Sequence, residues 1–295
     1  MEASSGIGAY LFRRPQWLRL AGDAWVEGAW VLGEPFLRWR DSLRDLDDCP
    51  GFPCHAFPEG GIYQLGAGSI QMVVDAGSVG QRNNGSHAHN DTLAFDLYAF
   101  GREVLPDRGT GVYTPDLSLR NRFRSSRAHN VVQVDGEEIN PFPEEPFRLI
   151  PADSPRVLRW RSSQRYAYLR AEHVGYRRLR AGVLHRRSIL MDHLKGTFQI
   201  EDRLEGKGRH RFLASFHLAP CWSVTLLEQG WTARSQEAGP TLNFLWRRRP
   251  EASRTQVEDD LHSPSYGLTQ KARTVRIEWE GDVPCRLRYE LTLLR

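Results

Sequence analysis

The feature that most constrains the fold is a series of short segments, rich in β-branched and aromatic residues, that runs from about residue 60 to the end of the chain. Each segment is bounded by Gly, Asp or Pro, which end strands and form turns. The segments are IYQLGAG, SIQMVVDAG, DTLAFDLYAFG, HNVVQVDG, RVLRWRSS, RYAYLRAEHV, LHRRSILMDHL, TFQIEDRLEG, RFLASFHLAP, TLNFLWRR, TVRIEWEG and RLRYELTLL. Turn-length gaps between so many strands favour a large antiparallel β-sandwich over alternating strands and helices.

The first part of the chain has a different pattern. Apolar residues recur near helical spacing at Trp17, Leu18, Leu20, Ala21 and Trp25. Pro15 suits the first turn of a helix. We therefore predict helices over residues 1–48, a Pro- and Gly-rich linker over 49–60, and the sandwich over 61–295. Two or three helices cannot bury their apolar faces alone, so they either pack on the sandwich or end a larger helical domain, and we favour the second interpretation.

Composition indicates a soluble globular protein. Of the 295 residues, 40% are hydrophobic, the mean hydropathy is −0.53, and no apolar run is long enough to span a membrane. The N-terminus has no signal-peptide pattern. The net charge is +4 and comes mainly from arginine, yet no recognition helix or aromatic RNA motif accompanies it, so we do not expect nucleic acid as a partner. Arginine also suits carboxylates and sulfates, which leaves an anionic saccharide open.

The four cysteines do not form a zinc-binding pattern. Cys49 and Cys54 flank the turn PGFP, and Cys221 and Cys285 stand alone. A disulfide between the first two and unpaired buried thiols are both compatible with this spacing.

The stretch GSHAHNDTLAFDLY carries the strongest chemical signal. Side chains alternate between the two faces of a strand, so we expect His87, His89 and Asp91 to project together at the start of a strand. Downstream, Asp107 lies in LPDRGTGVY and His129 in RFRSSRAHNVVQVDG. Two imidazoles and one carboxylate make a competent zinc site. For each histidine, a hydrogen-bonded residue at a sheet edge is the alternative.

A second ligand set uses some of the same residues. His89, Asp91 and His129 spell the H-x-D…H facial triad of non-haem Fe(II) oxygenases built on β-barrels. This hypothesis ranks lower because it leaves PDRGTGVY and the arginine-rich segment after it unexplained.

Other polar residues surround these candidates. The arginines near His129 are Arg120, Arg122, Arg124 and Arg127. A guanidinium binds carboxylate or sulfate through two parallel hydrogen bonds, so at least one is a candidate for substrate binding. Asn90 and Asn130 each follow a proposed ligand and suit hydrogen bonds behind it. His217 alternates with apolar neighbours and is expected in the core.

Taken together, GSHAHNDTLAFDLYAFGREVLPDRGTGVY and RNRFRSSRAHNVVQVDG resemble the signature of the heparinase II/III-like polysaccharide lyases. That signature reads H-x-H-x-D, a strand, D-x-G with a tyrosine, and then R-x-x-x-R-S-x-x-H-N. Members of this family join a toroid of paired helices to a C-terminal antiparallel β-sandwich. The resemblance thus implies that residues 1–48 are the last helices of such a toroid.

The resemblance also implies roles for individual residues. His89, Asp107 and His129 correspond to ligands of a structural zinc ion, and His87 faces the cleft and assists the chemistry. Tyr113 belongs to the D-x-G…Y segment and is predicted to contact substrate or take part in catalysis, with a tyrosine that packs over a glycine turn as the alternative. Arg122 and Arg124 are predicted to bind substrate. The implied reaction is β-elimination next to a uronic acid in an acidic polysaccharide.

One feature departs from the family pattern. The central tyrosine of these lyases and its Asn or His partner come from the toroid, whereas here Tyr10 alone precedes the linker and lacks a matching context. We therefore expect this chain to hold part of an active site and to be weakly active or inactive alone. A non-catalytic carbohydrate-binding sandwich is the competing hypothesis. The resemblance further implies a periplasmic or secreted location and leaves a homodimer open.

Overall fold

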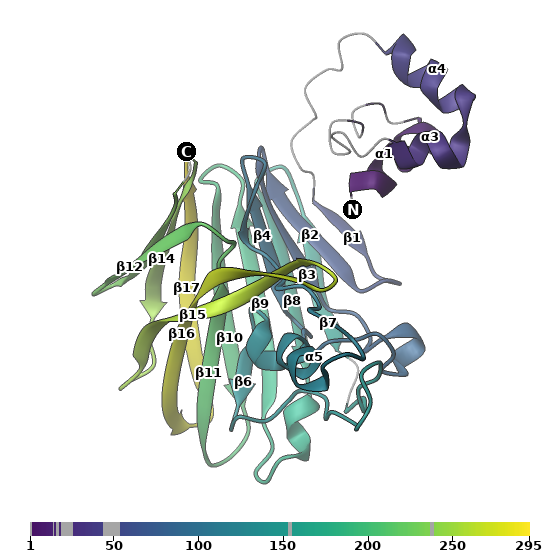
Figure 1. Ribbon diagram of the computed structural model, residues 1–295. Helices are drawn as coiled ribbons and strands as arrows, with labels where there is room; N and C mark the ends of the chain where they lie inside the picture. The colour runs from purple at the N-terminus through teal and green to yellow at the C-terminus, as the bar shows by residue number, and fades with distance from the viewer. Residues whose placement is uncertain are drawn as a thin grey trace. The chain divides into compact units, whose positions relative to one another are not determined.

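The structure is a computed structural model that describes residues 2–13, 15, 18, 26–43, 54–152, 155–236 and 239–295 (Figure 1). The chain divides into two compact units, residues 1–51 and 52–295. The first is helical and the second consists mainly of strands. Among the described residues, no helix is long and apolar enough to cross a membrane.

The helical unit contains α1 (Glu2–Leu11), α3 (Val26–Leu32) and α4 (Glu34–Ser42). Phe36 is fully buried, and a Cβ on Gly28 would lie 2.8 Å from its ring, so only glycine allows this contact. These helices agree with the helical pattern of the sequence. Trp17, Leu20, Ala21 and Trp25 lie outside the described residues, as does Cys49.

The second unit contains three antiparallel sheets. The first is formed in order by β1 (His55–Phe57), β2 (Ile62–Ala67), β3 (Ile70–Asp75), β4 (Phe95–Ala99) and β5 (Arg102–Leu105). The second is formed in order by β12 (Trp222–Leu227), β13 (Gly230–Ser235), β14 (Thr241–Arg248), β17 (Cys285–Leu294), β10 (Thr197–Glu205), β9 (Leu184–Asp192), β8 (Tyr166–His173) and β7 (Arg156–Ser162). The third is formed in order by β15 (Arg254–Ser265), β16 (Leu268–Asp282), β11 (Arg209–His217) and β6 (Val132–Val134).

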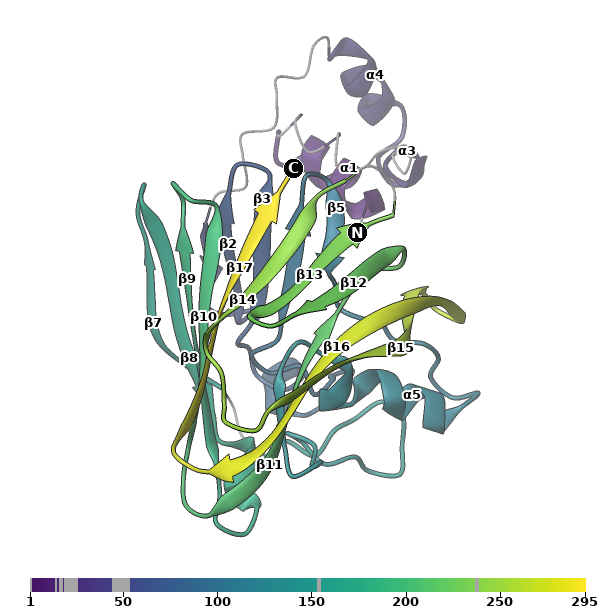
Figure 2. The ribbon, with the colours of Figure 1, turned by 90° about the vertical axis from the view of Figure 1, so that its left-hand side faces the viewer.

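The eight-stranded sheet packs against both smaller sheets and buries one continuous apolar core (Figure 2). Tyr63 of β2 contacts Trp160 of β7, with ring centroids 5.4 Å apart. Phe216 of β11 contacts Phe244 of β14 and Tyr289 of β17 at 5.1 and 5.3 Å. Alternation of buried and partly exposed residues along β3 matches a strand with one face in a core. The predicted mainly-β, antiparallel fold is confirmed.

All twelve segments singled out in the sequence contain strands, but five further strands were missed: β1, β5, β12, β13 and β15. β1 lies inside the segment predicted as a linker and pairs with β2 through His55–Gln64. A helix was also missed, α5 (Leu117–Arg124), whose first turn is capped by the Asp116 side chain.

The proposed division at residues 48 and 60 stays a prediction. Among the described cysteines, Cys54, Cys221 and Cys285 are free thiols.

Candidate functional site

The segment from His87 to Ala94 is a loop, so the prediction that it begins a strand is wrong. His87 and Leu93 have positive φ angles of 50° and 65°, and the Ala94 N–H donates to the Asp91 carbonyl at 2.6 Å. Such a turn cannot continue a pleated strand. The loop nevertheless places His87, His89 and Asp91 around one hollow of about 330 Å³.

The two ligand-type histidines, His89 and His129, lie close together, with ring centroids 5.3 Å apart. Three donor atoms lie within 4.8 Å of one another, one each from His89, Asp91 and His129. Asp107 approaches from the other side of His129, with its Oδ2 2.8 Å from Nδ1, and its Oδ1 accepts the Gly109 N–H at 2.7 Å. His129 Nε2 is buried without a hydrogen-bond partner among the described residues. We call His89, Asp91, Asp107 and His129 the His89 cluster.

The His89 cluster and its surroundings contain more carboxylates than imidazoles. Burial and the neighbouring Asp91 raise the pKa of Asp75 to about 7, and burial also raises the pKa of Asp91 and Asp96. Burial and the charge of His129 lower the pKa of His89 to about 3. Burial acts against ionisation of Asp107, but the adjacent His129 outweighs it and lowers the pKa of that carboxyl. A cation bound here would relieve the repulsion between these acids.

The donor set fits zinc. Two imidazoles and a carboxylate are a common zinc environment, and a ligating histidine typically bonds a carboxylate through its other nitrogen. The unpartnered His129 Nε2 and the Nδ1 contact with Asp107 match that arrangement. Asp91 and Asp107 are both candidates for the carboxylate ligand, and the predicted set His89, Asp107 and His129 stays a prediction.

Arg120 is a buried residue of α5 that holds His89 in place. Its guanidinium donates to His89 Nε2 at 2.7 Å and to the Pro146 carbonyl at 3.1 Å. It also lies 4.8 Å from the centre of the Tyr113 ring. The sequence marked Arg120 only as one of four arginines, and its contact with His89 depends on the missed helix α5.

The two arginines predicted to bind substrate differ in the structure. Arg124 is fully buried, and its guanidinium donates to the carbonyls of Arg148 and Glu145 at 2.7 and 2.9 Å. Those bonds hold the loop over α5. Arg122 is half exposed and bonds Asp260 at 2.9 Å. Only Arg122 of this pair presents its guanidinium to solvent.

Tyr113 lies in an aromatic group beside His87. Its ring centre is 6.4 Å from that of His87 and 5.4 Å from that of Phe147. Tyr266, at the turn between β15 and β16, stacks on Tyr113 at 5.5 Å and is 56% exposed. The sequence missed Tyr266 because it is far from the motif along the chain.

Buried hydrogen bonds fasten the loops that carry the His89 cluster. The Asn130 side chain donates to the Phe95 carbonyl at 2.8 Å and accepts the His217 N–H. Arg187 of β9 donates to the carbonyls of Leu93 and Asn130 at 2.7 and 2.6 Å. His217 is buried, as expected from its apolar neighbours. Arg187 carried no motif in the sequence and was missed.

Comparison with known proteins gives a consistent match. Residues 50–290 match the family described as Heparinase II/III-like, C-terminal. The chain is 31% identical over 97 residues to the heparin-sulfate lyase of Pedobacter heparinus, covering 30% of this chain and 14% of that protein. It is 24% identical over 267 residues to FtsZ-localized protein C of Caulobacter vibrioides, covering 83% of this chain and 44% of that protein.

Solved structures share the fold. The heparan sulfate lyase HepC of Pedobacter heparinus superposes with a TM-score of 0.72 at 19% identity, over 99% of this chain and 41% of that one. A chondroitin AC lyase of Streptomyces coelicolor, solved with chondroitin sulphate, gives 0.55 at 11% identity, over 95% of this chain and 38% of that one. The present chain thus spans less than half the length of each of these relatives.

Proposed function

This chain belongs to the heparinase II/III-like family, and we propose that it forms part of a polysaccharide lyase that cleaves uronic-acid-containing glycans by β-elimination. The relatives support this proposal, since one is a heparin-sulfate lyase and others of the same fold are heparan sulfate and chondroitin lyases. Because the chain covers only part of each of them, the reaction, the substrate and the periplasmic or secreted location are all proposals.

The observation that carries the proposal is the position of His87. Its side chain is exposed and lines the same hollow as His89 and Asp91. The His87 N–H donates to the Phe147 carbonyl at 2.6 Å, and its φ angle of 50° is unusual outside glycine. A histidine held in this way beside a cluster of partly buried acids is a candidate for handling protons or charge.

The chemistry asks for such a residue. β-Elimination removes the C5 proton next to the uronate carboxylate, breaks the bond between C4 and the leaving oxygen, and forms a C4–C5 double bond. The leaving oxygen must gain a proton, and the charge that develops on the carboxylate must be stabilised. We assign His87 to that stabilisation or proton transfer. Tyr113, whose ring centre lies 6.4 Å from that of His87, is assigned to substrate contact or catalysis. Arg122, which lines a different hollow from His87, is the exposed candidate for binding a substrate anion away from the reacting bond.

We further propose that zinc is bound by His89 and His129 with a carboxylate, and has a structural role. Asp107 is the ligand that the resemblance implies, whereas the 4.8 Å grouping favours Asp91. Zinc would supply positive charge among the partly buried acids and fix the two loops, while His87 stays free for substrate. Stoichiometric iron that is lost in Asp91→Ala would instead support the oxygenase hypothesis.

Activity is tested by the absorbance of unsaturated uronide formed from acidic polysaccharides. In a protein that joins this chain to a helical domain, we expect His87→Ala to lower turnover by ~10²-fold or more while leaving metal content unchanged. Alone, the chain is expected to have little lyase activity, because it lacks a tyrosine in the position of the central one of these lyases. Tyr10 contacts Phe36 and Trp39 inside the helical unit. Full activity of His87→Ala would contradict the assignment.

A second candidate function is non-catalytic. FtsZ-localized protein C matches 83% of this chain, and its name states a location and no reaction. Under this hypothesis the sandwich binds a glycan or another partner without cleaving it. Glycan binding without any formation of unsaturated uronide, in the same joined protein, would favour this candidate over the lyase.

A further inference from the structure

The outer face of the four-stranded sheet carries a row of polar side chains that do not line the hollow at His87. Leu213 of β11 lies opposite Gln133 of β6 on one side and opposite Glu278 of β16 on the other. Arg211 lies two residues from Leu213, so it projects from the same face, opposite Glu280. Alternation along these strands therefore brings amide, carboxylate and guanidinium groups together on one surface.

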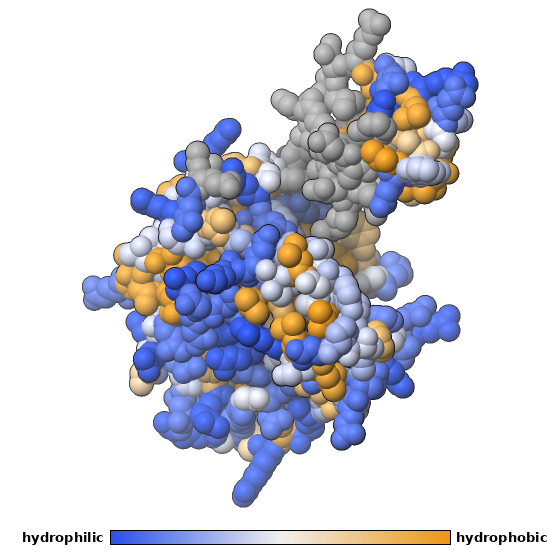
Figure 3. Space-filling view, in the orientation of Figure 1, coloured by the Kyte–Doolittle hydropathy of each residue, from blue (hydrophilic) through white to orange (hydrophobic). Residues whose placement is uncertain are grey.

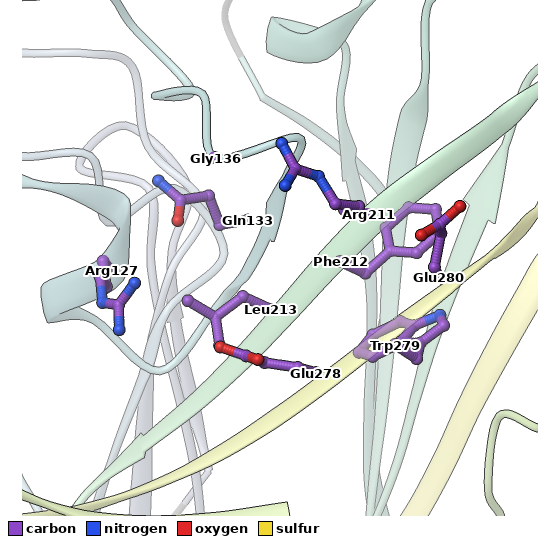
Figure 4. A pocket seen from close by; sticks show the side chains of 9 residues that line it. All are labelled: Arg127, Gln133, Gly136, Arg211, Phe212, Leu213, Glu278, Trp279 and Glu280. Carbon is purple, nitrogen blue, oxygen red and sulfur yellow. The ribbon is translucent and has the colours of Figure 1, made fainter. Parts of the chain in front are cut away.

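These residues surround a hollow of about 380 Å³. Figure 4 shows Arg127 and Arg211 on two sides of it, with the Gln133 amide between them and Glu278 opposite. Arg127 comes from the short helical turn Ser126–Ala128, which precedes β6. The hollow is thus built from four separate segments of the chain.

Polar groups in this hollow lack partners. Gln133 is only 5% exposed, yet among the described residues its side-chain amide makes no hydrogen bond. Among the residues that the structure describes, neither the Arg211 guanidinium nor the Glu278 carboxylate forms an ion pair. The Gln133 amide opens into the hollow, where it can bond a ligand that supplies hydrogen-bonding atoms.

A second hollow, of about 280 Å³, adjoins the first at Arg127. It is lined by Arg108, Arg122, Arg127, Arg276, Ser125, Glu258, Asp259 and Asp260. Asp260 bonds three of these arginines, and Asp259 pairs outside the hollow with Arg273 at 2.8 Å. Glu258 pairs with Arg127 and Arg276, so the four guanidinium groups of this hollow share two carboxylates, Glu258 and Asp260. Half of the Arg122 and Arg127 side chains is exposed, so both can reach a ligand.

We propose that the two hollows form one groove that binds a strand of acidic glycan. Arg122, Arg127 and Arg211 contact its carboxylate or sulfate groups, and Gln133 and Glu278 contact its hydroxyls. The assignment of a glycan rests on the proposed function; the groove itself is separate from the hollow at His87. It would hold the polymer at a distance from the reacting bond.

The residues of the groove favour a glycan over a nucleic acid. Acidic glycans carry hydroxyls between their charges, which suits alternating guanidinium, amide and carboxylate groups. Nucleic acid presents a charge at every phosphate and often stacks its bases on exposed aromatic rings. Here the aromatic residues of the hollow, Phe212 and Trp279, are only 2% and 5% exposed, so neither offers a ring on which a base could stack. The surface in Figure 3 is mainly hydrophilic with scattered apolar patches.

The test measures binding of size-defined heparin oligosaccharides, sulfated and desulfated, to the 295-residue chain at fixed ionic strength. We expect Arg211→Glu to weaken binding by ~10-fold or more, because a guanidinium–anion contact is replaced by repulsion. The matched control is Arg161→Glu, the same charge change at an exposed position of β7, expected to weaken binding by less than ~2-fold. Gln133→Leu, which keeps the side-chain volume, should weaken both oligosaccharides by ~3-fold or more.

Equal losses in Arg211→Glu and Arg161→Glu would overturn the proposal, because binding would then follow net charge alone. Single-stranded DNA that binds more tightly than the glycans and depends on Arg211 would also overturn it. Arg127→Gln provides a second variant with a milder change. The proposed lyase function is scored separately by unsaturated uronide, so glycan binding without turnover would refute only the lyase, and turnover without Arg211-dependent binding would refute only the groove.

Discussion

Two groups of histidines and aspartates lie in the β-unit, one buried and one partly exposed, and they differ in how fully their polar atoms are paired. The core network consists of His173, His185, Arg187 and Asp202. His185 bonds His173 at 3.2 Å and Asp202 at 2.8 Å, while Arg187 bonds both oxygens of Asp202 at 2.7 and 3.0 Å. Each charge in this network has a partner of opposite charge.

The His89 cluster lacks that balance. Asp91 and Asp107 lie near two imidazoles. Beside burial, their charges also raise the pKa of Asp75 and the pKa of Asp96. His129 Nε2 has no partner among the described residues. Buried charges are stable when they are paired or bind metal. The pairing makes the core network a structural element, and its absence at the His89 cluster supports the cation site that we propose there.

The largest effect is expected from breaking the core network. Asp202→Asn leaves Arg187 buried without its counter-charge, so we expect a loss of ~3–5 kcal/mol in the free energy of unfolding at pH 7. Urea unfolding measures this, with Glu280→Gln as the control. Glu280 pairs with Arg209 on the surface, where both side chains are more than half exposed, and its loss should cost under ~1 kcal/mol. Similar costs for the two variants would refute the contrast between buried and exposed pairs.

A smaller effect separates the two regions by pH. The pKa of Asp75 is raised by burial and by Asp91 to about 7, whereas an aspartate in an unfolded chain has a pKa of about 3.9. Between these values the folded state keeps a proton that the unfolded chain has released. The free energy of unfolding of metal-free protein should therefore fall by about 3 kcal/mol as the pH rises from about 4 to 7.

Variants sharpen this test. Asp75→Asn should flatten the slope between pH 4 and 7, and added zinc should also reduce it, because a nearby cation favours the ionised carboxylate. Asp202→Asn should leave this slope in place. Arg187 and His185 overcome burial and lower the pKa of Asp202, so the stability from Asp202 is present above about pH 4 and is lost as the pH falls below it. A slope that survives Asp75→Asn would refute the role of Asp75.

The sequence predicted the strands that pack into the core because their apolar residues alternate. Strands such as β1 and β5 are only three and four residues long, too short for that pattern to stand out. The loop at His87 was mistaken for a strand because alternating polar residues resemble a strand edge. Its turns depend on backbone bonds to distant residues, such as the Leu93 N–H to the Asp75 carbonyl at 2.8 Å.

The site was predictable only where a motif carried it. His87, His89, Asp107 and His129 stand in recognisable patterns, although their roles stay predictions. Arg187 and Tyr266 reach the site from β9 and from the β15–β16 turn. Contacts across 57 or more residues follow from strand pairing and not from local sequence, so no short pattern could have indicated them.

The most direct test of the cation site is metal analysis of the purified chain together with His89→Ala and His87→Ala. The two histidines are two positions apart, but only His89 belongs to the group of donor atoms within 4.8 Å. We predict about one zinc per chain in the unaltered protein and in His87→Ala, and little or none in His89→Ala. Equal loss of zinc in both variants, or full retention in His89→Ala, would contradict the account.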